Sequence, residues 1–274
     1  MYNKLISWYR LLYIKSILSI LSYKPLAWLN LVFLTTYIQY LHAAATPSCQ
    51  KTPLTLAAPL SPPYHTNNQQ GFIDKFLNLI FSEIGCKIKV ITLPAMRTLS
   101  DTNKGKLDGN FMFSDELYID KYPNLIRIEP SYFSYFLAFT GFGNLPKSDK
   151  EISIYRLATI RGMSLPKPLV DHQHVFLAKD LTQLTTLLRR NRVDVAIMPV
   201  AVAYFYKQQS CFKSLNITVY SELSVNLYIY LHKRHSNIKA PLSNSVRRLK
   251  RSKQYQQLLQ TAIRKGLDIP LPTC

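Results

Sequence analysis

Acidic side chains are scarce in this chain of 274 residues, where 15 Asp and Glu stand against 34 Lys and Arg and give a formal net charge of +19. Such an excess suits nucleic acid, an anionic membrane surface or an acidic ligand, and it equally suits a solvated basic surface. The basic residues are scattered apart from short runs at 189–192 and 247–253, and no nucleic-acid-binding motif accompanies them. We therefore predict no nucleic-acid partner.

Motifs for metal binding and covalent catalysis are lacking as well. There is no Cys-x-x-Cys pair and no cluster of His, so neither a metal nor a cofactor is expected. No paired carboxylates or nucleophile–base motif is present, which argues against an enzyme. Repeats and low-complexity segments are absent too, and 47% hydrophobic residues exclude a disordered chain.

The N-terminal region has the pattern of a secretory signal. Residues 1–23 contain basic residues but no acid, residues 26–41 carry no charge, and an Ala-rich stretch ends at Ala45. A basic segment, an apolar core and an Ala-x-Ala end predict a signal peptide over 1–45, cleaved after Ala45. The apolar core is short for a membrane-spanning helix, which needs about 20 residues. We expect a periplasmic protein; an uncleaved N-terminal membrane anchor is the alternative.

The chain has four cysteines, and all of them follow the predicted signal peptide. An even number in an oxidising compartment predicts two disulfides with three possible connectivities. Cys49 and Cys86 each precede a predicted strand, and these strands should be parallel neighbours, so both cysteines should lie at the same edge of the sheet. We therefore prefer Cys49–Cys86, which leaves Cys211–Cys274.

Residues 54–109 predict half of a small-molecule site. A strand at 54–58 and a strand at 87–93 are each followed by a turn and an amphipathic helix, the pattern of βαβ units in a parallel sheet. Ligands of open parallel sheets lie beyond the carboxyl ends of the strands. The residues that fall at those ends are Pro63, Tyr64, Pro94 and Arg97.

The second half of the chain follows the same order of elements. A strand at 157–160 precedes a helix at 181–190 with Leu at helical spacing, and a buried strand follows at 193–199. We predict two α/β lobes joined by two long strands, 131–140 and 225–231, with the C-terminal helices returning to the first lobe. Further strands are predicted at 125–128 and 217–220, and further helices at 201–208, 240–250 and 255–265.

The order and spacing of these segments resemble the bacterial extracellular solute-binding family 3, whose members serve amino-acid ABC transporters. The similar segments include APLSPPY, ITLPAMRTLSDTNKGKLDG, LATIRGMS and LLRRNRVDVAIMP. The resemblance implies a two-lobed type II periplasmic-binding-protein fold, a Venus flytrap with two hinge strands. By this resemblance 46–138 and 226–274 form the first lobe, and 139–225 form the second.

The resemblance also implies ligand-binding residues. Tyr64 would cover one face of the ligand, Arg97 would point into the cleft, and Ser164 would donate to a carboxylate. A turn position for Tyr64 and a surface ion pair for Arg97 are the alternatives. Two further candidates come from the pattern itself: Phe113 on an alternating strand, and Arg161 at a strand end, where it suits an anion.

The chain departs from the family at the groups that hold an α-amino acid. No Arg follows the Gly-x-x-Asp step until Arg127, and Pro199 stands where family members carry an Asp for the ammonium group. We therefore do not expect an ordinary α-amino acid as the ligand. Asp108 and Asp194, which precede predicted strands, are expected to make structural turn bonds.

The predicted function is capture of a small polar or anionic solute between two lobes, for an ABC permease at the membrane. A ligand sensor is one alternative. A cyclic-acid dehydratase, which shares this fold, is a weaker one. The acids that it could use are Asp115, Glu116, Glu129 and Glu222.

Overall fold

The computed structural model describes residues 49, 52–114, 121–147, 149–163, 165, 169 and 175–264. The predicted signal peptide, Ser164, Cys274 and two of the candidate acids (Asp115 and Glu116) lie outside the described residues. The chain divides into two compact units, Met1–Thr46 and Pro47–Cys274. All of the described residues belong to the second unit.

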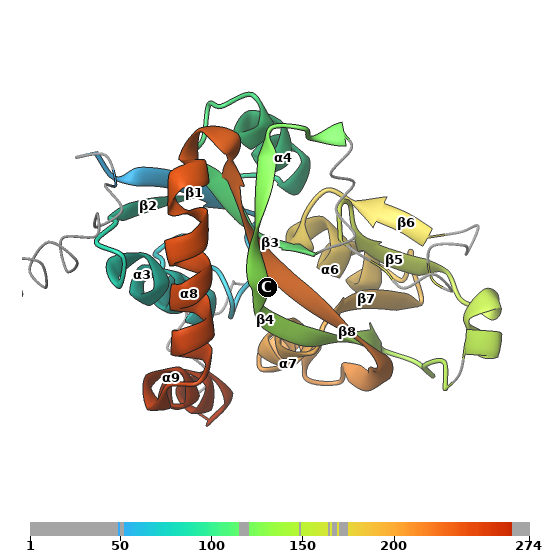
Figure 1. Ribbon diagram of the computed structural model, residues 1–274. Coiled ribbons are helices and arrows are strands. Elements are labelled where there is room, and N and C mark those ends of the chain that lie inside the picture. The colour runs from blue at the N-terminus through green and yellow to red at the C-terminus, as the bar shows by residue number, and fades with distance from the viewer. Residues whose placement is uncertain are drawn as a thin grey trace, which may run out of the picture. The chain divides into compact units, whose positions relative to one another are not determined.

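The described residues form one sheet of eight strands. Along the chain these are β1 (Leu54–Ala58), β2 (Ile88–Thr92), β3 (Gly109–Ser114), β4 (Leu125–Gly141), β5 (Leu157–Ile160), β6 (Val175–Ala178), β7 (Val195–Pro199) and β8 (Asn216–His232). Their order in the sheet is β2-β1-β3-β8-β4-β7-β5-β6 (Figure 1). β2, β1 and β3 are parallel, as are β7, β5 and β6, whereas β8 and β4 are antiparallel to their neighbours. We call the part built on β2, β1 and β3 lobe one, and the part built on β7, β5 and β6 lobe two.

β4 and β8 connect the two lobes. Each has 17 residues, and they pair with one another from Leu125 to Gly141. The prediction of separate strands at 125–128 and 131–140, and at 217–220 and 225–231, was wrong, because each pair is one continuous strand. The pairing of β4 with β8 shifts in register between Ile128 and Phe133 and between Phe136 and Leu137, and it continues beyond each shift.

Helices cover the sheet at the predicted places. They are α3 (Phe72–Ser82), α4 (Ala95–Asn103), α6 (Leu181–Arg189), α7 (Val200–Lys207), α8 (Lys239–Lys250) and α9 (Lys253–Arg264), with the short 3₁₀ segments η2 (Asp149–Ile154), η3 (Ser210–Phe212) and η4 (Lys233–Ile238). The Leu spacing expected for α6 is confirmed, since Leu181, Leu184 and Leu188 are buried. Within the described residues, no helix is both long and apolar enough to span a membrane.

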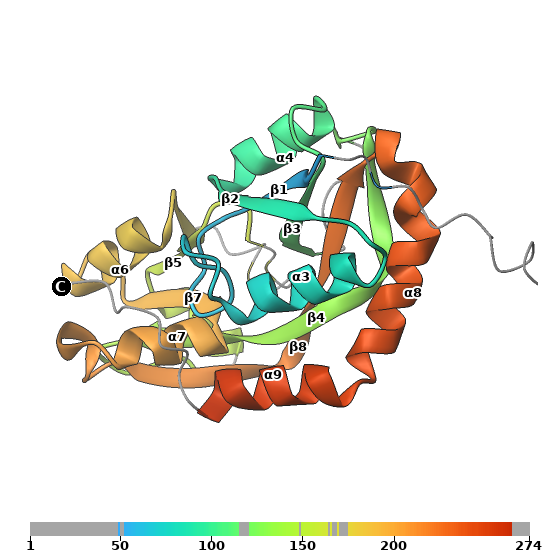
Figure 2. The same ribbon diagram turned by 90° about the vertical axis from the view of Figure 1, so that its left-hand side faces the viewer.

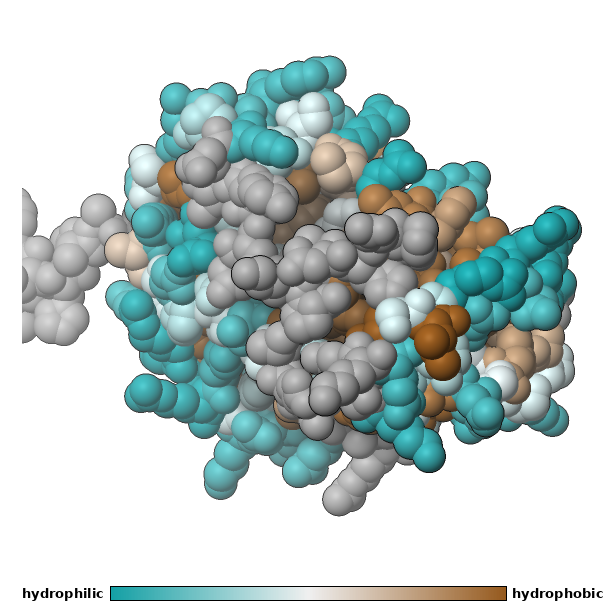
Figure 3. Space-filling model, turned by 90° about the vertical axis from the view of Figure 1, so that its right-hand side faces the viewer, coloured by the Kyte–Doolittle hydropathy of each residue, from teal (hydrophilic) through white to brown (hydrophobic). Residues whose placement is uncertain are grey.

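The sequence did not predict β6. This strand has four residues at the edge of the sheet, and Phe176 and Leu177 are exposed rather than alternating between a core face and a solvent face. Figure 3 views this side of the molecule and shows apolar atoms gathered beside a mainly hydrophilic surface. A short edge strand without period-two alternation has little pattern by which to detect it.

The last two helices pack against lobe one (Figure 2). The Ser245 hydroxyl on α8 donates to the Ile80 carbonyl of α3 over 2.8 Å, and the Tyr255 ring on α9 lies 4.7 Å from that of Phe76. Cys49 and Cys86 are joined by a disulfide with 5.3 Å between their Cα atoms. Cys211 is also disulfide-bonded, and its predicted partner, Cys274, is outside the described residues.

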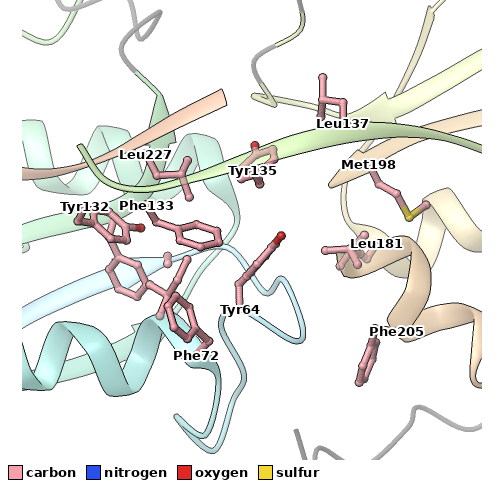
Figure 4. Close-up of a cluster of buried hydrophobic side chains, with 14 of the residues drawn as sticks. Tyr64, Phe72, Tyr132, Phe133, Tyr135, Leu137, Leu181, Met198, Phe205 and Leu227 are labelled. Carbon is pink, nitrogen blue, oxygen red and sulfur yellow. The ribbon is translucent and has the colours of Figure 1, made fainter. Parts of the chain in front are cut away.

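Aromatic side chains fill the core where β4 passes over the loop after β1 (Figure 4). The Tyr64 ring lies 5.2 Å from that of Phe133, which in turn lies 5.2 Å from that of Phe72. Each such ring contributes roughly 1.5–3 kcal/mol when it leaves water, so this cluster holds the loop firmly against the hinge strand.

Candidate ligand-binding cleft

A cavity of about 340 Å³ lies between lobe one and lobe two. Every parallel strand of both lobes reaches it at its carboxyl end or through the loop that follows, and Tyr135 reaches it from the middle of β4. The cavity therefore lies where open parallel sheets bind ligands. Its lining residues are 59–61, 92–95, 112–114, Tyr135, 160–163, 179–182 and Pro199.

A bulge shapes the lobe-one wall at the end of β3. The register with β8 shifts between Asn110 and Phe113, and Met112 has a φ of 70°, a left-handed conformation that is strained for a side chain of this kind. The Met112 N–H donates to the Tyr132 hydroxyl over 3.3 Å. Because the bulge breaks the alternation of the strand, Met112, Phe113 and Ser114 all line the cavity.

A buried chain of polar groups stands behind the same wall. His65 Nδ1 lies 2.6 Å from Asp74 Oδ1, and His65 Nε2 lies 3.0 Å from the hydroxyl of Thr92, which lines the cavity. His65 and Asp74 are completely buried. Asp74 also caps the start of α3, since its other oxygen accepts from the backbone N–H groups of Thr66 and Gly71, both at 3.1 Å. We call these three side chains the Asp74–His65–Thr92 relay.

The lobe-two wall carries exposed charges. Arg161, Lys179 and Asp180 line it, and neither cation forms an ion pair within the described part of the chain. Asp180 caps α6, because its carboxylate accepts from the Gln183 N–H over 2.8 Å. The Gln183 side chain in turn accepts from the Lys179 N–H over 2.7 Å. The cap fixes the place of Asp180 at the start of α6.

Three of the described helices begin at the cavity. The lining includes Pro94 and Ala95 at the start of α4, Asp180 to Thr182 at the start of α6, and Pro199 just before α7. The N-terminus of a helix carries a partial positive charge and unpaired backbone N–H groups. Together with Arg161 and Lys179, these helix ends favour a negatively charged group in the cavity.

The two lobes touch beside the cavity. A β-carbon added at Gly162, in the loop after β5, would lie 3.4 Å from Ala95 Cβ and 3.5 Å from Met96 Sδ on α4. Tyr64 of lobe one also lies close to the backbone of Ala201 in α7. A solute in the cavity would therefore contact both lobes at once.

Two of the predicted site residues line the cavity, namely Phe113 and Arg161. Phe113 is buried, and Arg161 is exposed at the end of β5, where its N–H donates to the Ala178 carbonyl over 2.8 Å. Ser164 lies outside the described residues.

Tyr64 is not among the lining residues. Its side chain is only 6% exposed and packs between Phe133 and Tyr135, with 6.0 Å between the rings of the two tyrosines. Burial raises the pKa of Tyr64, as does the neighbouring Tyr135. The ring points into the aromatic core because burial of its carbon surface there is more favourable than a position in a half-open cleft.

Arg97 does not line the cavity either. Its side chain is 67% exposed and pairs with Asp101 one helical turn later, at 3.3 Å. α4 buries the face that carries Thr98, Leu99 and Thr102, which turns Arg97 toward solvent. This is the surface pairing that the sequence left open as the alternative.

Sequence reasoning missed several lining residues. Asp180 precedes an apolar-periodic helix and has Gln three residues later, a capping pattern that would have placed it at the start of that helix. Thr92 is the last residue of β2, so the rule that ligands lie at the carboxyl ends of parallel strands could have found it. Tyr135 could not, because nothing local shows which residue in the middle of β4 faces the cleft. Among the described residues, no group of three or more His, Cys, Asp or Glu could hold a metal ion.

No protein-family model matches the chain. It is 24% identical to an uncharacterized protein of Shewanella oneidensis over 217 residues, which cover 73% of this chain and 80% of that protein.

Solved structures with the same fold are numerous. The GluR0 ligand-binding core from Nostoc punctiforme, in complex with L-glutamate, has a TM-score of 0.65 and 19% identity, and the match covers 76% of this chain and 98% of that one. The substrate-binding protein of an amino acid ABC transporter has a TM-score of 0.63 and 15% identity, with 76% and 97% covered. A Salmonella typhimurium periplasmic binding protein with high arginine specificity has a TM-score of 0.65 and 13% identity, with 76% and 98% covered. The chain therefore has the two-lobed Venus-flytrap fold of periplasmic binding proteins, with β4 and β8 as its hinge strands.

Proposed function

We propose that this chain is a solute-binding protein of the extracellular family 3 type, which captures a small polar or anionic solute between its lobes. The observation that carries the proposal is the cavity between the lobes, where Arg161, Lys179 and three helix N-termini converge. Among the proteins that share the fold, one is in complex with L-glutamate and another serves an amino acid ABC transporter.

Capture requires that the solute bind the closed form more tightly than the open one. Arg161 and Lys179 would meet an anionic group from lobe two, while Phe113 and Thr92 would contact the solute from lobe one. Since β4 and β8 carry both lobes, a change at these strands would open and close the cleft.

The proposal includes export and a membrane partner. Residues 1–45 would act as a signal peptide, the mature chain would work in the periplasm, and an ABC permease would receive the solute. The proposed lobe boundaries, 138/139 and 225/226, fall within β4 and β8.

The described residues do not favour the dehydratase. Glu129 pairs with Arg127 at 2.6 Å and is not among the lining residues, and the acid in the described lining, Asp180, caps a helix. Nor does any described feature favour a sensor over a transport protein.

A thermal-shift screen of organic acids, amino acids, polyamines and peptides tests the proposal, because a ligand that binds only the folded chain raises its melting temperature. We expect dicarboxylates or related anions to stabilise the protein. Calorimetry should then show that Arg161→Ala and Lys179→Ala each weaken binding of the hit by about tenfold, the value of one charge-assisted hydrogen bond. Arg97→Ala is the matched control and should leave affinity unchanged. A screen in which only polyamines bind would contradict the anionic cleft.

A further inference from the structure

The Asp74–His65–Thr92 relay connects a buried carboxylate to the surface of the cavity. Asp74 and His65 are completely buried in lobe one, and Thr92 reaches the cavity from the end of β2. The Phe111 ring stands edge-on to the imidazole at 5.4 Å, and apolar packing of this kind holds the imidazole in place. The capping of α3 needs Asp74 but neither His65 nor Thr92, so the outer part of the relay calls for another explanation.

The hydrogen bonds of the relay fix the direction in which each proton points. Asp74 accepts from the N–H groups of Thr66 and Gly71 at the start of α3, and such bonds favour the ionised carboxylate, which can only accept. His65 Nδ1 must therefore carry the proton that it shares with Asp74. With a neutral imidazole the other nitrogen is an acceptor, and the Thr92 hydroxyl would then donate to His65 Nε2.

With its proton donated to His65, the Thr92 hydroxyl can only accept a hydrogen bond from a ligand in the cavity. The two cations on the facing wall have the opposite character, because Arg161 and Lys179 can only donate. The third charged group of that wall, Asp180, accepts from the Gln183 N–H through one oxygen and keeps further lone pairs that can accept. A ligand that satisfies both walls needs an acceptor for lobe two and a donor for lobe one.

We propose that Thr92 is a hydrogen-bond acceptor for the solute, held in that role by His65 and Asp74, and that the solute therefore carries a hydroxyl, amide or ammonium group beside its anionic group. This inference rests on the proposed function and deepens it. Thr92 would contact the solute directly, whereas His65 and Asp74 are positioning residues.

Matched sets of probes test the donor requirement. Glutarate, 2-hydroxyglutarate and L-glutamate differ only in a hydrogen, hydroxyl or ammonium at one carbon; succinate, malate and L-aspartate form a shorter set, and propanoate, lactate and L-alanine the shortest. Calorimetry measures the affinity of each probe. We expect the donor-bearing members of at least one set to bind about tenfold more tightly than the member without a donor, because the latter leaves Thr92 unpaired.

Three variants locate that preference. Thr92→Val keeps the shape of the side chain but removes the oxygen, and it should lower affinity for the donor-bearing probe about tenfold while leaving the plain acid within about twofold. Thr92→Ser should restore the preference. Thr182→Val makes the same change on the facing wall, at a hydroxyl outside the relay, and should preserve the preference.

Nitrogen-15 NMR of the histidines reads the relay without any ligand. We expect one histidine to be protonated at Nδ1 and not at Nε2, with an Nε2 resonance that Thr92→Val moves and Thr182→Val does not. A proton on that Nε2 would overturn the inference, since Thr92 would then be free to donate.

The remaining outcomes separate the inference from the proposed function. If plain acids bind as tightly as donor-bearing ones and Thr92→Val has no effect, the inference fails while solute capture stands. If none of the probes stabilises the folded wild-type protein, anion capture fails and the inference fails with it. A burst of nitrophenolate from p-nitrophenyl acetate that Thr92→Val abolishes would also overturn the binding role, because Thr92 would then be a nucleophile oriented by His and Asp.

Discussion

In both lobes an Asp that precedes a parallel strand accepts a hydrogen bond from a backbone N–H at the neighbouring strand. In lobe one, Asp108 precedes β3 and accepts from the Thr55 N–H of the neighbouring β1 over 2.7 Å. In lobe two, Asp194 precedes β7 and accepts from the Arg156 N–H, just before the neighbouring β5, over 2.8 Å. Each Asp also pairs with an Arg at 2.6 Å. Both residues thus make structural bonds, but these bonds join neighbouring strands and do not lie within the turns where the sequence predicted them.

The two aspartates differ in their surroundings. The Asp108 side chain is 17% exposed and pairs with His235 as well as Arg234, whereas the Asp194 side chain is 33% exposed. Burial raises the pKa of Asp108, but bonds from Thr55, Arg234 and His235 outweigh it and lower the pKa overall. The pKa of Asp194 is lowered chiefly by its bond with the Arg156 side chain. Asp108 is therefore more buried than Asp194 and has more hydrogen-bond partners.

The walls of the cleft differ in the same sense. Lobe one presents Thr92 backed by a buried relay, while lobe two presents charges at exposed strand ends. Lobe one also packs against α8 and α9. The comparison suggests a division of labour: lobe one provides a rigid wall with a fixed hydrogen-bond direction, and lobe two brings the charge that attracts the solute.

Removal of the buried carboxylate should have the largest effect. Asp74→Ala strands His65 and two backbone N–H groups in a buried site, and we expect it to lower the free energy of unfolding by about 3–5 kcal/mol. Asp180→Asn is the lobe-two control. Asn caps helices as well as Asp does, so the change should stay within about 0.5 kcal/mol. Urea denaturation measures both, and equal losses would refute the contrast between the lobes.

The paired aspartates should rank next. Asp108→Asn weakens three bonds in a half-buried site, and we expect a loss of about 1–3 kcal/mol in urea denaturation. Asp194→Asn should cost less because its site is more exposed. A larger loss for Asp194→Asn would reverse the ranking of the two aspartates.

Acid should act on the same residues. Because the folded-state pKa of Asp108 lies below its ordinary value of 3.8, the stability it contributes is complete above that value and is lost as the pH falls below about 4. The wild type should therefore lose stability more steeply than Asp108→Asn in that range. Parallel acid-unfolding curves would show that the Asp108 bonds contribute nothing.

Contact between the lobes can be tested at Gly162. Its φ of 87° is unfavourable for any other residue, so Gly162→Ala should cost about 1 kcal/mol, and the added methyl would lie in van der Waals contact with Ala95 and Met96 across the cleft. We expect a lower melting temperature and weaker ligand binding. Gly143→Ala is the control, because a β-carbon there meets nothing within 4 Å. Equal binding by both variants would indicate that the lobes close without this contact.

The smallest effect is expected on the outer face of α4. Arg97→Ala removes one exposed ion pair with Asp101, which is worth no more than about 0.5 kcal/mol. Both stability and ligand affinity should stay close to wild type. A clear loss of affinity would show that Arg97 contributes to ligand binding, so that lobe one as well as lobe two supplies a charged group.

Much of the fold could be predicted because local patterns report local structure. The Leu spacing of α6 and the apolar strands depend on residues that are neighbours in sequence, whereas the bonds of Asp108 and Asp194 join segments 53 and 38 residues apart. The site was harder to predict. Phe113 and Arg161 line the cleft because strand ends converge there, but the same rule wrongly included Tyr64, whose ring packs into the core instead.

The sequence alone thus determined most of the segments that become strands and helices, their order, and the end of the sheet at which a ligand would lie, because short-range sterics and hydrophobic period encode these features. It did not determine β6 or the continuity of β4 and β8. Only the tertiary structure decided which face of α4 turns Arg97 outward and which aromatic ring fills the core. It also decided that His65 meets Asp74 and Thr92, 9 and 27 residues away in sequence. Such choices depend on packing between distant segments, where burial of one surface excludes another, and no local pattern records the outcome.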